Sequence, residues 1–429
     1  MNLKNRNITV LGLGRSGFES AKFLCERGAR VFVSEFKSTE HFLNCKNELE
    51  LLEAEVELGK HSFDRISRSD FIVISPGISP TTEIYQKTKS RSIPLVSEIE
   101  LAYRFCPAPI VAVTGTNGKT TVTTLVHKML LENGFQSVIC GNIGNPFIGE
   151  VSRLNKDSVV VLEISSFQLQ NISKFRPHIA ILLNLTDNHY DWHGDFNNYA
   201  DAKWNVFKNQ TANDYALLNE NDHESVCRAH SVRAQKVYFG AGEFNNPNFE
   251  ACLSLARIYH LDLEKCRKIL MEFRGIEHRL EEVPSQDGIR YMNDSKSTTI
   301  ASLKWALDRM NQKVTLIMGG LHKGGDFSQL GGKISEKVQC LVLIGKAADL
   351  IERSFKTQVP IYKALSLEDA VQQARAHSKA GDVILFSPAC ASFDMFQDYQ
   401  NRGCQFKQIV RGFKGVQTSP SISHLQSEH

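Results

Sequence analysis

The segment IVAVTGTNGKTT, residues 110–121, predicts a phosphate-binding loop between a buried strand and a helix. Its first four residues are apolar, as in a strand that is buried on both faces. Apolar side chains then recur with the spacing of one helix face, at Val122, Leu125, Val126, Met129 and Leu130. Gly134 can end this helix. A strand, a glycine turn, Lys-Thr and a helix, in that order, are what a phosphate loop requires.

The glycine turn offers an anion three kinds of contact. Backbone N–H groups and the helix N-terminus face it, Lys119 adds a positive charge, and Thr120 can ligate Mg²⁺. Only Thr116 and Asn117 separate the glycines, so the loop is short, and a plain capping turn with a solvated lysine is the alternative. The flanking elements favour a nucleoside triphosphate site. The predicted ATP contacts here are Gly115, Thr116, Asn117, Gly118, Lys119, Thr120 and Thr121.

The composition argues against several classes of protein. Fifty Lys and Arg against 47 Asp and Glu give a formal net charge of +3, which does not suggest a nucleic-acid or membrane-binding surface. The ten cysteines include no C-x-x-C pair, so neither a zinc site nor a disulfide framework is predicted. A strand begins near Ile8 with no signal peptide before it, and no apolar run is long enough to span a membrane. We expect a cytoplasmic monomer.

Strand and helix patterns alternate along the chain, which predicts an α/β protein of three domains. Residues 1–105 predict a Rossmann-like domain. Residues 106–276 predict a central P-loop ATPase-like domain with a parallel sheet, and residues 277–416 a second Rossmann-like domain. We expect the Ser-rich residues 417–429 to be a disordered tail.

The first domain carries a pyrophosphate fingerprint. GLGRSG, residues 12–17, follows a strand and opens a helix, and the next strand closes on Glu35. The fingerprint does not say which nucleotide is bound, since NAD and a UDP-linked molecule both carry a pyrophosphate and a ribose. Ser75-Pro76-Gly77 follows the buried strand 71–74 and is either a ligand contact or a plain turn. The candidate contacts of this site are Gly14, Arg15, Ser16, Glu35, Lys37, Ser75, Pro76 and Gly77.

Two features of the central domain suggest metal chemistry. Glu163 ends the apolar strand 158–164, where a carboxylate is costly unless Mg²⁺ or a core Arg or Lys compensates it. A predicted strand over residues 179–185 then delivers a loop, 186–195, with three acids and two histidines. Lys203, on the helix that follows, has the pattern of an ordinary solvated lysine.

The last domain places polar loops after strands predicted at 314–318, 341–344 and 383–386. The loops are residues 293–298, 319–326 and 387–394. Because ligands collect at the carboxyl ends of parallel strands, we expect these loops to converge on one crevice.

The segments TGTNGKTT, LEISSFQL, GNIGNP and NLTDNHYDWHGDFNNYADAK together resemble the Mur ligase family, which builds the peptide of bacterial peptidoglycan. The resemblance implies that Lys203 is carbamylated and helps to hold a second Mg²⁺, that Glu163 and His189 ligate magnesium, and that Asn142 and His189 contact a UDP-linked substrate. It also places Asn248 and Arg279 at ATP. Ala251 departs from the asparagine common there, which leaves one adenine contact open.

The loops of the last domain, with SFDMFQDYQNRGCQF, most resemble members that add D-glutamate to UDP-N-acetylmuramoyl-L-alanine. The D-N-P-R and Y-x-H-H-P motifs of other members are absent. The resemblance implies that D-glutamate is bound by Thr298, Lys323, Ser392 and Tyr399, the last departing from the usual phenylalanine.

The expected reaction is ATP-dependent amide ligation through an acyl phosphate, with two Mg²⁺ sites. The expected catalytic residues are Lys119, His189, Lys203, Asp294 and Lys296, with Asp294 also at ATP; the expected metal ligands are Thr120, Glu163, His189 and carbamylated Lys203. Three alternatives stay open at this point. One is a sibling ligase of the folylpolyglutamate synthase type. The others are a nicotinamide-dependent oxidoreductase, which GLGRSG and Glu35 would suit, and a nucleotide-gated binding protein without turnover.

Overall fold

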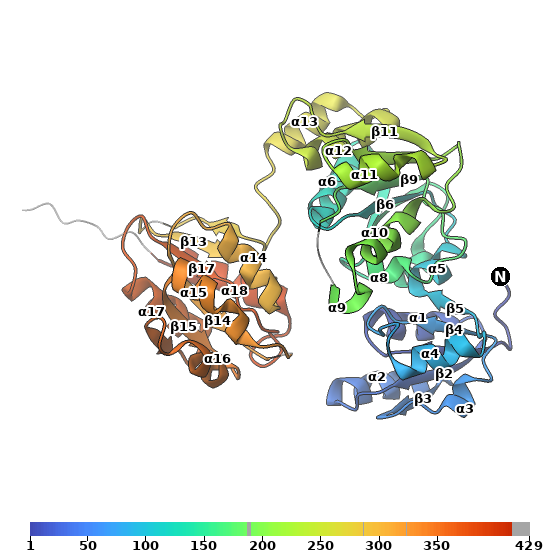
Figure 1. Cartoon of the computed structure of the whole chain (residues 1–429), viewed down its shortest axis with the longest axis horizontal. Coiled ribbons are helices and arrows are strands. Elements are labelled where there is room, and N and C mark those ends of the chain that lie inside the picture. Colours follow the sequence, from blue (N-terminus) through green and yellow to red (C-terminus); the bar gives the residue numbers. More distant parts are fainter. Residues whose placement is uncertain (187–189, 286, 323, 414–429) are drawn as a thin grey trace, which may run out of the picture. The chain divides into compact units, whose positions relative to one another are not determined.

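The computed structural model describes residues 1–413 except 187–189, 286 and 323 (Figure 1). The predictions for His189, Lys323 and the C-terminal tail therefore lie outside the described residues. The chain divides into two compact units, Met1–Phe273 and Arg274–His429. Strands and helices alternate along the chain, so the predicted α/β fold class is confirmed. The exact domain boundaries stay a prediction.

The N-terminal sheet is parallel and has the strand order β3-β2-β1-β4-β5. Its strands are β1 (Asn7–Leu11), β2 (Arg30–Glu35), β3 (Glu55–Leu58), β4 (Phe71–Ile74) and β5 (Leu95–Ser97). Its helices are α1 (Arg15–Cys25), α2 (Glu40–Glu50), α3 (Phe63–Ile66), α4 (Glu83–Ser90) and α5 (Glu98–Tyr103). All four residues of β4, which lies between β1 and β5, are buried, which is why it reads as a continuous apolar run.

The middle sheet is also parallel, in the order β11-β10-β9-β6-β8-β7. Its strands are β6 (Ile110–Thr114), β7 (Gln136–Gly141), β8 (Ser158–Glu163), β9 (Ile179–Leu182), β10 (Tyr215–Asn219) and β11 (Gln235–Phe239). Its helices are α6 (Lys119–Glu132), α7 (Phe147–Glu150), α8 (Ser166–Leu169), α9 (Tyr190–His193), α10 (Phe196–Trp204), α11 (His223–Arg228), α12 (Pro247–Ile258) and α13 (Leu263–Met271), with 3-10 turns at Val151–Arg153, Asn205–Phe207 and Ala229–Ser231.

Buried hydrogen bonds join these two sheets into one unit. The carboxylate of Glu100 accepts from the backbone N–H groups of Ser173, Lys174 and Phe175 at 2.8–3.0 Å. The carboxylate of Glu98, two residues earlier, accepts from the backbone N–H of Ile148 at 2.6 Å. Buried acids of α5 thus fix the N-terminal domain on the central one.

The C-terminal unit has a sheet of order β12-β13-β17-β14-β15-β16, parallel except for β12. Its strands are β12 (Glu281–Val283), β13 (Arg290–Asn293), β14 (Val314–Gly319), β15 (Val338–Ile344), β16 (Ile361–Lys363) and β17 (Val383–Phe386). Its helices are α14 (Ile300–Asp308), α15 (Gly331–Lys337), α16 (Ala348–Phe355), α17 (Leu367–Ala376) and α18 (Tyr399–Arg411), with a 3-10 turn at Phe327–Leu330.

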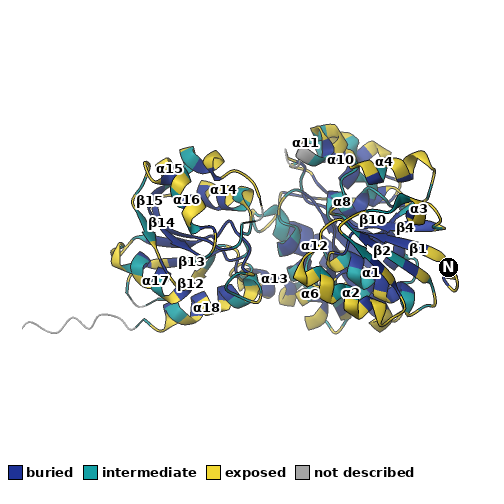
Figure 2. Ribbon diagram, turned by 90° about the horizontal axis from the view of Figure 1, so that it is seen from below, coloured by how far each residue is buried: buried dark blue, intermediate teal, exposed yellow. Residues whose placement is uncertain are grey.

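The apolar core follows the strands of all three sheets, as the burial colouring shows (Figure 2). The strand predicted at 179–185 ends earlier, at Leu182. Asn184, just beyond it, contacts the phosphate loop instead, since its Oδ1 accepts from the N–H of Asn117. Within the described part of the chain, no helix is both long and apolar enough to cross a membrane.

Candidate active site

The glycine turn that the sequence predicts to be a phosphate loop lies between β6 and α6. Gly118 has a φ of 83°, a left-handed conformation that suits glycine, and α6 begins directly after it. The Nζ of Lys119 donates hydrogen bonds to the carbonyl oxygens of Gly115 and Thr116, each at 2.9 Å. Lys119 therefore curls over its own loop, and the alternative of a solvated lysine beside a plain turn is not what the structure shows.

Neighbouring elements hold this loop in shape. The Oγ1 of Thr116 lies 2.9 Å from the hydroxyl of Tyr199 on α10, and the N–H of Asn117 donates to the Oδ1 of Asn184 at 2.9 Å. A Cβ on Gly118 would lie 2.5 Å from the Oδ1 of Asn248, at the start of α12. The structure thus brings Asn248 against the phosphate loop.

Glu163 is buried at the end of β8, with 2% of its surface exposed. Its Oε1 accepts from the Nδ2 of Asn142 at 2.7 Å, whereas its buried Oε2 has no hydrogen-bond partner among the described residues. No salt bridge to Glu163 is found among the described residues, but its charge raises the pKa of the buried Lys203, so both the metal ligand and the pairing with a core lysine stay predictions. An orphaned buried carboxylate oxygen fits a metal ligand.

Lys203 is buried, with 2% of its surface exposed, so the expectation of a solvated lysine is wrong. Its Nζ lies 4.9 Å from the centre of the Tyr199 ring. Burial lowers the pKa of Lys203 well below its ordinary value, and the charge of Lys119 lowers it further while Glu163 opposes the shift. A neutral amine is the form that can take up CO₂, so the site fits the carbamate that the resemblance implies.

His193 is a buried histidine of this region, and the sequence did not distinguish it. Its Nε2 lies 3.0 Å from the Oγ of Ser166, and its ring stacks on Phe167 with an interplanar angle of 3°. The signal was present, since His193 belongs to the same acidic loop as His189. Spacing alone could not tell that His193 is buried.

The nucleotide fingerprint of the first domain lines a pocket of about 950 Å³. All eight predicted contacts reach it: Gly14, Arg15, Ser16, Glu35, Lys37, Ser75, Pro76 and Gly77. The carboxylate of Glu35 accepts from the N–H groups of Leu13 and Lys37 at 2.8 and 2.9 Å, so it also braces the loop. Phe36 and His61 add aromatic faces that the sequence did not single out.

This pocket is connected to Glu163 by hydrogen bonds that run through one loop. The guanidinium of Arg15 donates to the carbonyl oxygen of Gly144 at 2.7 Å. The same loop carries Asn142, whose side chain donates to Glu163. A short path of contacts therefore runs from the pyrophosphate fingerprint to the end of β8.

In the C-terminal unit the three predicted loops are joined to one another. Leu321 and Ala391 exchange backbone hydrogen bonds at 2.9 Å. The fully buried Arg402 of α18 donates to the carbonyl oxygens of Ser295 and Cys390, which lie on two of the loops. These contacts join the three loops as expected, while a crevice between them stays a prediction.

Several predicted residues meet on these loops. The Oδ2 of Asp294 accepts from the Oγ of Ser387 at 2.7 Å, and burial raises the pKa of Asp294 to about 7, against the opposing effect of its hydrogen bonds. The Nζ of Lys296 donates to the hydroxyl of Tyr399 at 2.8 Å. Ser392 is buried, Thr298 half-buried and Arg279 exposed.

Family comparisons cover nearly all of the chain. Residues 6–97 match the family described as Mur ligase MurD-like, N-terminal domain, and residues 113–273 match the Mur ligase middle domain. Residues 278–390 match the Mur ligase, glutamate ligase domain. The chain belongs to the Mur ligase family. Because the chain belongs to this family, its N-terminal fingerprint no longer suggests a nicotinamide-dependent oxidoreductase.

Among similar Mur ligases are UDP-N-acetylmuramoylalanine–D-glutamate ligases of two organisms. The one from Geotalea daltonii is 37% identical over 449 residues, covering 97% of this chain and 99% of that protein. The one from Chloroherpeton thalassium is 34% identical over 464 residues, covering 95% and 98%.

Solved structures of other ligases share the fold. MurF from Acinetobacter baumannii is 15% identical with a TM-score of 0.54, covering 95% of this chain and 92% of that one. E. coli FolC in complex with DHPP and ADP is 17% identical with a TM-score of 0.53, covering 72% and 92%.

Proposed function

We propose that this Mur ligase joins D-glutamate to UDP-N-acetylmuramoyl-L-alanine at the expense of ATP, in the synthesis of peptidoglycan precursors. The observation that carries the proposal is the 37% identity to a D-glutamate ligase over 97% of the chain, which includes both nucleotide fingerprints and the C-terminal loops. The enzyme is an ADP-forming ligase of an acid and an amino acid.

The proposed ATP site is the phosphate loop with Asn248, Arg279 and Asp294. Support comes from the curled Lys119 and from Asn248, which abuts Gly118. The UDP-linked substrate would occupy the pocket behind Gly14, Arg15 and Ser16 and reach Asn142 and His189. D-Glutamate would be held by Thr298, Lys323, Ser392 and Tyr399.

The residues that would hold two Mg²⁺ ions are Thr120, Glu163, His189 and carbamylated Lys203. The orphaned Oε2 of Glu163 and the lowered pKa of Lys203 support this assignment. When bound, the ions neutralise phosphate charge that would otherwise repel an anionic nucleophile. Family membership is consistent with ATP and Mg²⁺, and the number of ions is part of the proposal.

A carboxylate does not condense with an amine until one of its oxygens becomes a leaving group. In the proposed reaction an L-alanyl carboxylate oxygen attacks the γ-phosphorus of ATP, the bond from that phosphorus to the β-γ bridging oxygen breaks, and ADP leaves. The amine of D-glutamate then attacks the acyl phosphate, and the tetrahedral intermediate collapses to the amide and phosphate. Lys119 offsets the charge gathered at the transferring phosphoryl group.

Asp294 is the proposed acceptor of the proton that the amine loses. Its pKa of about 7 is near the working pH, which is the range in which a carboxylate both accepts and releases protons readily. Lys296 holds the hydroxyl of Tyr399 and thereby orders one wall of the proposed D-glutamate site.

We also propose that the enzyme acts as a monomer in the cytoplasm, without nucleic-acid or membrane partners. The small net charge of +3 supports the absence of a polyanion-binding surface. The substrates, a nucleotide-linked sugar and ATP, are small and soluble.

The test is a panel of amino acids offered with UDP-N-acetylmuramoyl-L-alanine and Mg-ATP and scored by phosphate release. D-Glutamate should give turnover, while L-glutamate, L-alanine and meso-diaminopimelate should not. A second arm replaces the UDP substrate with a reduced folate and L-glutamate. Turnover confined to that arm would establish the folylpolyglutamate synthase type instead, and ATP binding without phosphate release in either arm would indicate a binding protein.

A further inference from the structure

Arg15 joins the pyrophosphate fingerprint to the central domain. It is the first residue of α1, directly after Gly14, and it lines the pocket of the N-terminal domain. Its guanidinium donates a hydrogen bond to the carbonyl oxygen of Gly144, 129 residues further along the chain, at 2.7 Å. The fork of an arginine has more N–H donors than this one contact uses. The side chain can therefore hold Gly144 and a phosphate oxygen at the same time.

The loop that receives this hydrogen bond, residues 141–146, is fixed to Glu163. The backbone N–H of Asn142 donates to the carbonyl oxygen of Glu163 at 2.8 Å, and its side-chain amide donates to the Oε1 at 2.7 Å. Gly141 packs so closely here that an added Cβ would lie 2.3 Å from the same carbonyl oxygen. The loop thus has little room to move independently of the end of β8. A shift of Gly144 should therefore displace the Glu163 carboxylate.

The hydrogen bond between Arg15 and Gly144 is one that a bound pyrophosphate would strengthen. Arg15 is exposed, so water competes for its donors, and fixing a long side chain costs rotamer entropy. A pyrophosphate at the N-terminus of α1 would hold the guanidinium by charge-assisted hydrogen bonds. A guanidinium that is already held in this way loses little further entropy when it contacts Gly144. An occupied pocket should thus steady the loop 141–146.

We propose that Arg15 couples the two nucleotide sites by holding the UDP-linked substrate and Gly144 together. Through Gly144 and Asn142 it keeps the Glu163 carboxylate in place for the metal ion that accompanies ATP, so Arg15 is a positioning residue. The inference rests on the proposed function, because it requires that a UDP-linked substrate fills the pocket. Coupling between binding sites is reciprocal, so each nucleotide raises the affinity for the other by the same factor.

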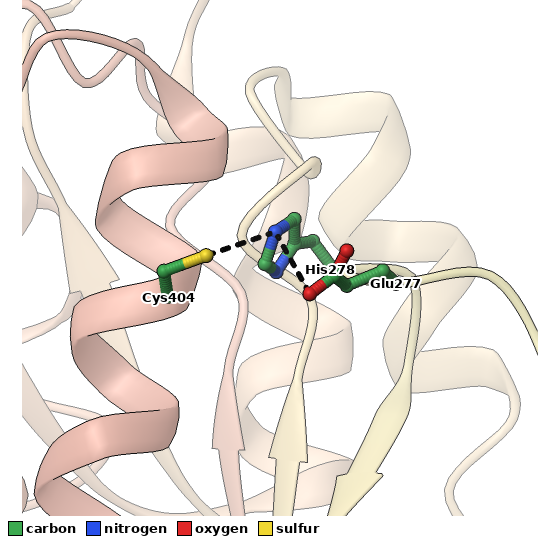
Figure 3. A group of neighbouring side chains, drawn as sticks. All are labelled: Glu277, His278 and Cys404. Atoms are coloured by element: carbon green, nitrogen blue, oxygen red, sulfur yellow. Dashed lines mark hydrogen bonds and ion pairs between the residues drawn. The ribbon is translucent and has the colours of Figure 1, made fainter.

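A second group of potential metal ligands does not compete with Glu163 in this scheme. Among the described residues, Glu277, His278 and Cys404 bring their ligand atoms within 4.8 Å of one another (Figure 3). The Nδ2 of Asn293 donates to the Nδ1 of His278 at 2.9 Å, so the Nε2 carries the ring proton and has no lone pair for a metal. The Glu277 oxygen nearest to that nitrogen is paired with Lys407. Mg²⁺ added in a binding experiment should therefore not be held by this group.

Arg27 provides a matched control for Arg15. Its guanidinium also reaches from the N-terminal domain to the central one, where it lies 3.5 Å from the Oγ of Ser152. Ser152 lies outside the loop 141–146, and the described wall of the pocket does not include Arg27. Replacing Arg27 thus removes an arginine and a contact between the two domains without touching the path to Glu163.

The test is a calorimetric titration of the full-length protein with β,γ-methylene-ATP and Mg²⁺, with and without saturating UDP-N-acetylmuramoyl-L-alanine. In the wild type the UDP substrate should lower the Kd of the ATP analogue about tenfold. Arg15→Met should reduce this factor to below about twofold and leave the Kd of the analogue alone unchanged. Arg15→Lys keeps a charge near the phosphate but lacks the planar fork, so it should bind the UDP substrate and still lose most of the coupling. Arg27→Met should keep the coupling of the wild type.

Three results would overturn the inference. They are a wild type that binds both ligands without coupling, full coupling in Arg15→Met at saturating UDP substrate, and a loss of coupling in Arg27→Met that equals the loss in Arg15→Met. Thermal unfolding checks that each variant is folded. A wild type that turns over D-glutamate without coupling would remove only the role of Arg15. A wild type that does not bind the UDP substrate would overturn the proposed function and this inference with it.

Discussion

Lys119, Glu163 and Lys203 place two amines and one carboxylate in or beside the core of the central domain. Glu163 and Lys203 are each 2% exposed. Charged groups are seldom buried unless paired, and here no direct salt bridge joins these residues within the described chain. The Glu163 oxygen without a hydrogen-bond partner and the buried amine of Lys203 support the proposed metal ion and carbamate, which would give each of them a partner.

Lys119→Ala tests the phosphate cradle. One charge pair about 4 Å apart contributes on the order of 4 kcal/mol at an effective dielectric near 20, which corresponds to a loss of roughly a thousandfold in kcat/KM. Lys128→Ala, an exposed lysine on the same helix, is the control and should keep the wild-type rate. If Lys119→Ala keeps more than about a tenth of the rate, the cradle assignment is wrong.

Lys203→Ala tests the carbamate. A metal ligand contributes several kcal/mol to stabilising the transition state, so its loss should lower kcat by at least about a hundredfold. Acetate or formate added at millimolar levels should restore part of the rate, because a free carboxylate can occupy the place of the missing one. Wild-type protein in ¹³C-bicarbonate should show a carbamate resonance that Lys203→Ala lacks. Full activity of Lys203→Ala, or a wild-type protein without this resonance, would contradict the assignment.

Asp294→Asn tests the buried carboxyl through pH. The pKa of Asp294 rises from 3.8 to about 7 in the folded protein, so between these values the folded state holds a proton that the unfolded state has lost. The free energy of unfolding contributed by this group therefore falls as pH rises from about 4 to 7, by up to roughly 4 kcal/mol. Asp294→Asn should be less sensitive to pH between 5 and 8 in urea unfolding followed by circular dichroism. Equal slopes for the two proteins would refute the shifted pKa.

At the residue scale, sequence reasoning succeeded where a residue violated its local pattern. The burial of Glu163 could be predicted because it interrupts an apolar strand, while its role as a metal ligand stays a prediction. Lys203 could not, because a lysine on an amphipathic helix looks the same whether its face meets solvent or a buried site. Its burial depends on Tyr199 and the phosphate loop, which only the folded chain brings together.

At the scale of helices and strands, prediction was possible because apolar residues recur with a regular period and glycines mark the boundaries. Strands β4 and β17 have the predicted ends, whereas β9 ends at Leu182, three residues early. An apolar run continues beyond that strand, and pairing stops because Asn184 turns to the phosphate loop. The hydrophobic pattern of a sequence predicts which residues are buried. It does not predict where the hydrogen bonds between two strands end.

Gly118→Ala tests the turn between β6 and α6. The methyl group would have a left-handed backbone and would lie 2.5 Å from the Oδ1 of Asn248, so the loop must shift. We expect a stability loss of roughly 1–2 kcal/mol and a loss of ATP binding. Gly134→Ala is a matched control, since its φ is 85° and nothing lies within 4 Å of the added carbon. It should lose similar stability and bind ATP normally in calorimetry; equal ATP affinity in both variants would contradict the loop's role.

At the scale of the whole molecule, alternating strands and helices predicted three α/β domains, and the structure has three sheets. The eight predicted pyrophosphate contacts line one pocket because strand ends and glycine turns fix where a ligand can lie. The choice between dinucleotide and UDP-linked ligand was beyond pattern alone, since both present the same phosphates to the same loop. Only the combination of this pocket with a second phosphate loop distinguishes a ligase from an oxidoreductase.

The most direct test of acyl-phosphate ligation follows an oxygen atom. UDP-N-acetylmuramoyl-L-alanine labelled with ¹⁸O in both alanyl carboxylate oxygens is turned over with D-glutamate and Mg-ATP, and the released phosphate is analysed by mass spectrometry. If the carboxylate attacks ATP, each phosphate carries one ¹⁸O and the product amide keeps the other. Unlabelled phosphate, at a rate that still yields the amide, would contradict the proposed reaction.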